Sequence, residues 1–350
     1  MKKSFGIAGA FVGLIVGAGF ASGQEIMQYF TSFGRMGMVG AVVATVIFAF
    51  LGMILAQIGS DLQTTSHKEG IYYIGGRYIG AVLDIVITVI LFAIAVVMFA
   101  GSGSTFQQMY GINPGIGSIL MATATIVTLL LKADNIIKIV AALTPYLMGI
   151  IFIILIYSLF TMDYSIGELD AMAQNQPSAA SGWIMGTILY VSYNIASGAA
   201  MLIVMGGKER NRKIAGRGGI LGGVMVGFLI LLINGALFAK MDVVAGVDMP
   251  TLELAERIHP VVGFLMSLLL LGMMYSTAVG MFYVFTIRLL SPHRKLFKPA
   301  VMLIGLAGFA ISLVGFTTLV GKLYSTMGYL GFILILAVLF SWMRNRKVAS

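Results

Sequence analysis

The chain alternates long apolar stretches with short polar segments over almost its whole length. Apolar runs close to the roughly 20 residues that cross a bilayer recur from the first residues to the last. They predict ten membrane helices, at residues 5–32, 36–60, 78–108, 114–132, 136–161, 181–206, 216–239, 260–290, 299–319 and 324–343. The expected fold class is therefore an all-α polytopic membrane protein.

Two of the predicted helices carry interruptions. In the first, three glycines between residues 17 and 23 are followed at once by Gln24 and Glu25. Glycine weakens a helix interior by about 1 kcal/mol relative to alanine, and backbone groups freed within a membrane must find other partners. The sixth helix carries Ser-Tyr-Asn-Ile-Ala-Ser-Gly at 192–198. We expect both helices to be broken near the bilayer midplane, the arrangement typical of transporters with inverted repeats.

Polar connectors divide the chain. Residues 162–180 separate a first five-helix repeat, 1–161, from a second, 181–343, and 344–350 form a tail. Five helices per half give the two halves opposite orientations in the membrane. A further connector, 250–260, has amphipathic helical spacing. It predicts either a cap over the outer vestibule or a helix lying at headgroup level.

Composition excludes a soluble protein. Of the 350 residues 59% are hydrophobic and 10% charged, and the mean hydropathy is +1.00. The basic start lacks a cleavage signal, so we interpret the first apolar run as a retained helix. The absence of cysteine excludes disulfides and thiolate metal sites.

The net charge of +9 follows the predicted topology. With the N-terminus inside, eighteen of the 22 lysines and arginines fall in cytoplasmic segments. The other four, on the outside, are Arg35, Lys240, Arg257 and Lys322. We therefore predict that both termini are cytoplasmic. The positive charge is an orientation signal, and no nucleic-acid partner is expected.

Two motifs carry a resemblance to known proteins. Gly13-x-x-Val16-Gly17-x-Gly19 in the first helix and Ser276-Thr277 in the eighth resemble the LeuT-type fold of the amino acid/polyamine/organocation superfamily. More narrowly, the run Gly-Ala-Gly-Phe-Ala-Ser-Gly-Gln-Glu resembles the YkvI-like bacterial membrane proteins. The resemblance implies a multi-pass protein of the bacterial cytoplasmic membrane, ten helices in a 5+5 inverted repeat, and transport by alternating access. Signatures of enzymes are missing from the sequence, so no enzymatic activity is expected.

The resemblance also implies a sodium ion as the coupling ion. Its ligands would be the carbonyls of Gly13, Val16 and Met273 and the hydroxyls of Ser276 and Thr277. Alternatively, the two hydroxyls bond to the preceding turn of their own helix, as such residues commonly do. No other cofactor is expected.

Substrate recognition is expected at the same break. Free amides near the start of the second half-helix suit a carboxylate, and freed carbonyls of the first and sixth helices suit an ammonium, which together describe a small amino acid or related amine. The expected contact residues are Ile15, Ala18, Gly19, Phe20, Gln24, Glu25, Tyr193, Asn194 and Ser197. The spacing Gly9-x-x-x-Gly13-x-x-x-Gly17 also predicts close helix packing.

Glu25 leaves alternatives open. An intramembrane carboxylate is costly and is taken as functional by default. It could be an outer-gate partner, a proton site, or a ligand for a cation or an amine. The sequence therefore also allows a transporter coupled to protons through Glu25, or a membrane receptor that binds a nutrient without transporting it. The pattern carries no signal for oligomeric state.

Overall fold

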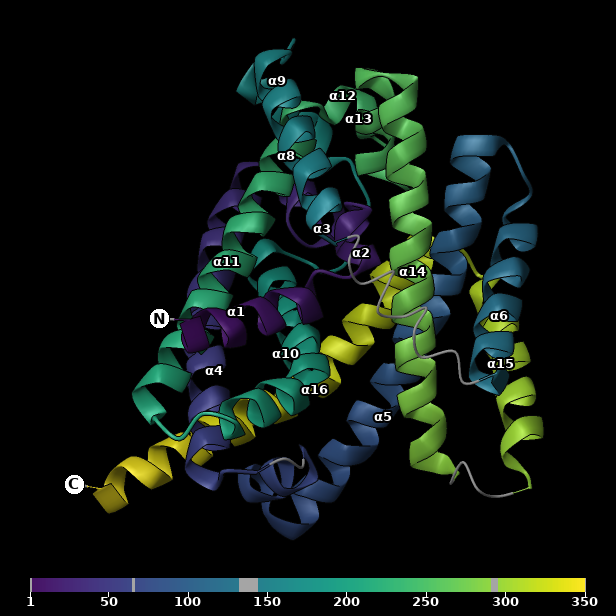
Figure 1. Cartoon of the computed structure of the whole chain (residues 1–350). Coiled ribbons are helices and arrows are strands. Elements are labelled where there is room, and N and C mark those ends of the chain that lie inside the picture. Colours follow the sequence, from purple (N-terminus) through teal and green to yellow (C-terminus); the bar gives the residue numbers. More distant parts are fainter. Residues whose placement is uncertain (1, 65–66, 132–143, 291–294, 350) are drawn as a thin grey trace.

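The protein is built from helices packed side by side (Figure 1). The computed structural model describes residues 2–64, 67–131, 144–290 and 295–349, and no β-strand occurs within these ranges. Seven of the described helices are long and apolar enough to cross a membrane, and three shorter apolar helices accompany them. The predicted all-α membrane class is confirmed.

The elements fall into three groups. The seven long helices are α4 (Arg35–Leu62), α5 (His67–Tyr110), α6 (Pro114–Leu131), α10 (Trp183–Gly207), α11 (Arg212–Ala239), α14 (Pro260–Leu289) and α16 (Phe316–Ala349). The shorter apolar helices are α1 (Lys2–Ile15), α8 (Thr144–Phe160) and α15 (Phe297–Ser312). Between them lie α2 (Ala18–Ala21), α3 (Gln24–Tyr29), the 3-10 turn η1 (Thr31–Phe33), α9 (Ile166–Gln174), α12 (Met241–Val244) and α13 (Pro250–Ile258).

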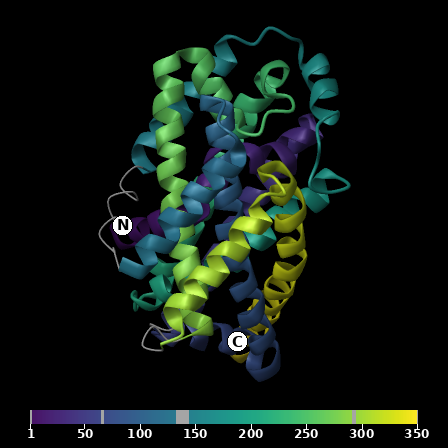
Figure 2. The same ribbon diagram turned by 90° about the vertical axis from the view of Figure 1, so that its right-hand side faces the viewer.

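The first predicted helix is broken where the glycines lie. α1 ends at Ile15, α2 begins at Ala18, and the N–H of Gly17 donates to the carbonyl of Ile15 (2.8 Å) instead of the carbonyl four residues back. A second break follows at Gly23, whose φ of +81° is left-handed and favours glycine. In both views α1 runs across the long axis of α14 (Figures 1 and 2). Residues 5–32 therefore do not form one helix with a single interruption. The segment is divided into α1, α2, α3 and η1, which corrects the predicted range.

The predicted break in the sixth helix is wrong. α10 is continuous from Trp183 to Gly207. Its polar side chains bond within the helix: the Asn194 amide donates to the carbonyl of Tyr190 (3.0 Å), and the Ser197 hydroxyl to the carbonyl of Asn194 (2.9 Å). Because side chains of this kind can bond to the preceding turn, they satisfy themselves without unwinding the backbone.

Two predicted helix boundaries also change. The boundary expected near residues 320–323 lies instead at 313–315, where Gly315 has a φ of +102°, and the exposed Lys322 falls inside α16. The third helix begins eleven residues earlier than predicted, at His67, and bends at Gly76. The first part of the predicted fifth helix, up to residue 143, lies outside the described residues.

Glycines set the closest helix contacts. α4 packs along α10 and α11, and a Cβ at Gly223 of α11 would lie 2.3 Å from the backbone nitrogen of Ala49 on α4. The glycines predicted to pack behave differently. Among the residues that the structure describes, a Cβ at Gly9, Gly13 or Gly17 would meet nothing within 4 Å. The described residues therefore show no packing partner for these three glycines, and α1 contacts α10 and α11.

The amphipathic segment forms α13 and acts as a cap. Leu252, Leu254 and Ala255 are fully buried within the protein. The Thr251 hydroxyl donates to the carbonyl of Ala21 (2.5 Å), and the Thr251 N–H donates to the carbonyl of Ser22 (3.1 Å). These bonds hold α13 directly over α2, which supports the predicted cap rather than a helix in the headgroup layer.

Candidate functional site

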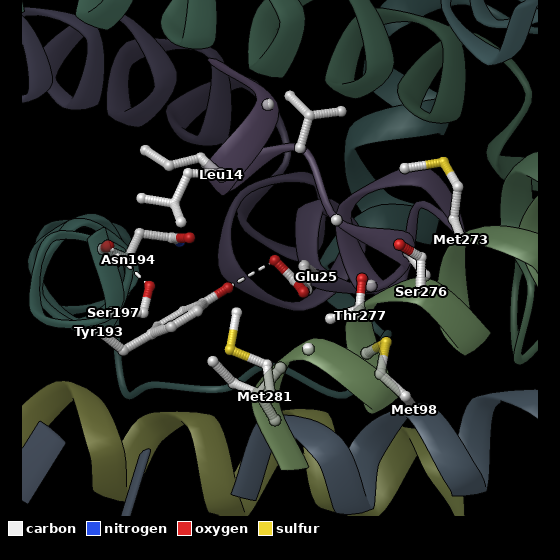
Figure 3. A pocket seen from close by; sticks show the side chains of 18 of the residues that line it. Leu14, Glu25, Met98, Tyr193, Asn194, Ser197, Met273, Ser276, Thr277 and Met281 are labelled. Carbon is white, nitrogen blue, oxygen red and sulfur yellow. Dashed lines mark hydrogen bonds between the residues drawn. The ribbon is translucent and has the colours of Figure 1, made fainter. Parts of the chain in front are cut away.

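A cavity of about 210 Å³ lies at the break between α1 and α2 (Figure 3). Side chains from α5, α10, α14 and α16 complete its wall. Twelve of the predicted site residues line it: Gly13, Ile15, Val16, Ala18, Gly19, Glu25, Tyr193, Asn194, Ser197, Met273, Ser276 and Thr277. Segments that are up to 311 residues apart in the sequence (Gly13 to Tyr324) thus meet around one small space.

Two predicted residues do not line the cavity. The Gln24 amide donates to the Thr317 hydroxyl (3.2 Å) at the start of α16, and the Phe20 side chain is fully buried elsewhere. The reason is the turn at Gly23, which re-aims α3. Neighbouring positions of a helix differ by about 100° in direction, so Glu25 faces the cavity while Gln24 faces away.

The cavity also contains residues that the sequence analysis did not select. They are Leu14, Gly17, Ile94, Met98, Gly280, Met281 and Tyr324. Gly280 and Met281 lie four residues after Ser276 and Thr277, so the helical repeat could have identified them. Ile94, Met98 and Tyr324 carry no comparable signal, because nothing in the sequence says which face of their helices meets the break.

Ser276 and Thr277 present free hydroxyls to the cavity. No described residue accepts a hydrogen bond from either hydroxyl, whereas Thr286 on the same helix donates to the carbonyl of Phe282 (2.8 Å). The alternative of back-bonding to α14 is therefore not seen. Both hydroxyls lie on the side of α14 that faces the break (Figure 3).

Residues whose backbone oxygens could join these hydroxyls line the same cavity. The Gly13 carbonyl has lost its helical donor, because the Gly17 N–H bonds to Ile15 instead. Within the described part of the chain, His, Cys, Asp and Glu form no group of three or more that could hold a metal. The oxygens available here are neutral, and a monovalent hard cation is the ion that such a set of carbonyls and hydroxyls fits.

Glu25 is the charged residue of the cavity wall. It is 5% exposed, and its Oε2 accepts a hydrogen bond from the Tyr193 hydroxyl (2.5 Å; Figure 3). Its Oε1 lies against Gly19 so closely that a Cβ there would be 2.0 Å away. Glu25 has no ion-pair partner among the described residues. A carboxylate in this position is costly unless something neutralises it.

Aromatic rings fix the position of the Tyr193 hydroxyl. The rings of Tyr193 and Tyr324 have centroids 4.8 Å apart, and those of Tyr29 and Tyr190 lie 5.9 and 5.5 Å from Tyr193. The Tyr29 hydroxyl is in turn hydrogen-bonded to Ser325 (2.9 Å). The donor to Glu25 is therefore held by packing from α3, α10 and α16.

Polar side chains close the molecule on the α13 side of the cavity. Asp248, between α12 and α13, accepts hydrogen bonds from Ser104 of α5 (2.8 Å) and Thr317 of α16 (2.5 Å). Gln108 pairs with both the N–H and the carbonyl of Met249 (3.0 and 3.2 Å). The sequence analysis missed this closure, since a single aspartate in a connector gives no sign of its partners.

Comparison with solved structures identifies the architecture as the LeuT-type fold. The inward-facing conformation of Mhp1 matches with a TM-score of 0.68 and 14% identity over 94% of this chain and 73% of that one. MhsT in complex with L-phenylalanine matches with a TM-score of 0.62 and 19% identity, over 95% and 88%. A Na⁺-coupled sialic acid symporter in a substrate-bound outward-open state gives 0.59 and 14%, over 96% and 78%. The LeuT-type fold expected from the resemblance is confirmed, whereas the predicted count of ten helices is not.

Sequence relatives extend along nearly the whole chain. The uncharacterized membrane protein YkvI of Bacillus subtilis (strain 168) is 23% identical over 340 residues, which cover 95% of this chain and 94% of YkvI. YyaD, an uncharacterized protein of the same organism, is 25% identical over 330 residues, 94% of each chain. No family model matches the chain. The chain is thus similar to YkvI and YyaD along nearly its whole length, in agreement with the resemblance carried by its first helix.

Proposed function

We propose that the protein is a secondary active transporter that moves a small amino acid or related amine by alternating access, with sodium as the coupling ion. The observation that carries the proposal is the broken first helix opening into a cavity lined by the predicted residues. Solved proteins of the same fold include one with bound L-phenylalanine and one described as a Na⁺-coupled symporter. These proteins support both parts of the proposal, an amino acid as the substrate and sodium as the coupling ion.

Sodium is proposed at Ser276 and Thr277 together with the carbonyls of Gly13, Val16 and Met273. The two hydroxyls have no described protein partner, and all five residues line the cavity. Uncommitted oxygens within a membrane protein need a partner, and a bound cation supplies one. When bound, the ion would join α14 to the break in α1.

The test is sodium-dependent stabilisation of the purified protein. A ligand that binds the folded state raises the unfolding temperature by mass action. We expect sodium chloride to raise the thermal midpoint relative to potassium chloride, and the double variant Ser276→Ala, Thr277→Val to lose the shift. Thr286→Val is the matched control, because that hydroxyl already donates within α14. An unchanged sodium shift in the double variant would remove this ion site.

A second coupling ion is supported by one observation, the unpaired carboxylate of Glu25. A proton on Glu25 would neutralise it as a cation does. In sodium-free liposomes, solute uptake driven by a pH gradient and lost in Glu25→Gln would favour proton coupling. Uptake that follows a sodium gradient alone would favour sodium.

The orientation is proposed from the lysines and arginines. Eighteen of the 22 fall on the side of the termini in the predicted topology, so the termini are placed in the cytoplasm of a bacterial cell and α13 outside. The division into two five-helix repeats, 1–161 and 181–343, belongs to the same proposal.

A further inference from the structure

Among the described residues that line the cavity, Glu25 supplies the one carboxyl group, and no lysine, arginine or histidine accompanies it. No described lysine, arginine or histidine forms an ion pair with this carboxylate. A carboxylate surrounded by protein within a membrane is unfavourable without a counter-charge. A proton, the coupling ion or a cationic substrate could supply the missing counter-charge.

The position of the carboxylate is fixed. Tyr193 donates to Oε2 at 2.5 Å, and Oε1 lies beside Gly19, where only a glycine leaves room for it. Oε1 receives no hydrogen bond from a described residue, and Glu25 belongs to the cavity wall. The carboxylate therefore presents one free oxygen at the break, the place where a zwitterionic substrate would put its own carboxylate.

The rest of the wall suits the body of an amine. The rings of Tyr193 and Tyr324 both line the cavity, and aromatic faces attract ammonium groups. Met98, Met273 and Met281 supply flexible thioether surfaces that adapt to an alkyl tail. The volume of about 210 Å³ is smaller than the roughly 300–1,000 Å³ typical of pockets for drug-sized ligands. The space fits a compact solute with a cationic head.

We infer that the substrate is a small organic cation, an alkyl or aryl-alkyl ammonium without a carboxylate of its own, and that Glu25 is its counter-ion. This inference rests on the proposed function and narrows its substrate class. An α-amino acid would bring a second carboxylate close to Glu25, and the described residues of the wall include no lysine, arginine or histidine to bind it. The amine obtained by removing that carboxylate can pair with Glu25 and brings no second carboxylate.

Matched solute pairs test the inference. Thermal unfolding of the purified protein is measured in sodium chloride with leucine and 3-methylbutylamine, phenylalanine and phenethylamine, and lysine and cadaverine. We expect at least one amine to stabilise the protein at concentrations at least tenfold lower than its amino acid. Glu25→Gln, which keeps the shape and removes the charge, should lose that stabilisation. Glu256→Gln, the same change at an exposed position of α13, should keep it.

Several outcomes would overturn the inference. Amino acids that stabilise the protein while their amines do not would show that the site takes zwitterions, and the proposed transport of amino acids would stand. The inference would also be contradicted if an amine still stabilised the Glu25→Gln variant, or if no amine of the series stabilised the parent protein. If Glu25→Gln abolishes the sodium shift and leaves an amine shift intact, Glu25 serves the ion instead. The proposed sodium site is tested independently by the sodium-dependent thermal shift of the Ser276 and Thr277 double variant.

Discussion

At the scale of single residues, the site depends on a contact that only glycine permits. Oε1 of Glu25 occupies the space that a side chain at Gly19 would need. Gly17, two residues earlier in the same break, has open space at that position and a φ of −90°. The two glycines therefore look alike in the sequence and differ in what surrounds them.

Gly19→Ala is expected to destabilise the protein by about 1–3 kcal/mol, the usual range for overpacking a buried position. The new methyl group would have to displace the carboxylate from its place beside Tyr193. Gly17→Ala is the control and should change the thermal midpoint little. In a Glu25→Ala background the cost of Gly19→Ala should fall, because neighbouring substitutions couple through the contact that they share. Equal costs in both backgrounds would contradict the proposed contact.

At the scale of elements, a helix break could be predicted from the sequence only where no side chain could satisfy the backbone within the helix. Three glycines within seven residues leave the first helix no compensating side chain, and its break was predictable. Asn194 and Ser197 can bond within their own turn, and in α10 they do, so their polarity was a false sign of a break. The boundary between α15 and α16 was misplaced because the charge of Lys322 was weighted above the conformational freedom of Gly315.

The closure above the cavity was beyond the reach of the sequence for a related reason. The partners of Asp248 lie in α5 and α16, 144 and 69 residues away, and pattern within one segment carries no information about them. By contrast, Ser276 and Thr277 were expected at the site from the resemblance of their motif to a known fold, and both line the cavity.

Asp248→Asn is expected to loosen the α13 side. An asparagine keeps one acceptor oxygen but loses the charge that strengthens both bonds, and a charge-assisted hydrogen bond contributes about 1.5–3 kcal/mol. The chain has no cysteine, so Met281→Cys gives a single thiol in the cavity. We expect a membrane-impermeant thiol reagent added on the α13 side to label it roughly ten times faster in the Asp248→Asn background. Asp242→Asn, an exposed aspartate on α12, is the matched control. Equal labelling rates in both backgrounds would show that Asp248 does not close this side.

At the scale of the whole molecule, the described structure is tied on one side of the cavity and open along α1. The segment from Asp248 to Thr251 is bonded to α2, α5 and α16. A Cβ at Gly6, Gly9 or Gly13 of α1 would have no described atom within 4 Å. Alternating access requires the two sides to exchange roles. Small residues allow two helices to approach closely, and these three glycines of α1 have no described neighbour at that position. We therefore propose that this glycine face of α1 packs against a neighbouring helix in the opposite state and so closes that side of the cavity.

Gly9→Leu tests that movement. In the described state a Cβ at residue 9 would meet no described atom within 4 Å, so we expect the thermal midpoint to stay near that of the parent protein. In the opposite state it would hold α1 away from its partner, and the protein should remain open on the side of the termini. In the parent background we expect sodium to lower the rate at which the thiol of Met281→Cys is labelled from that side. In the Gly9→Leu background sodium should no longer lower that rate. Gly167→Leu, at an equally open position on α9, provides the control. If both leucine variants respond to sodium as the parent does, α1 closes without using this face, and the gate has to be sought on another helix.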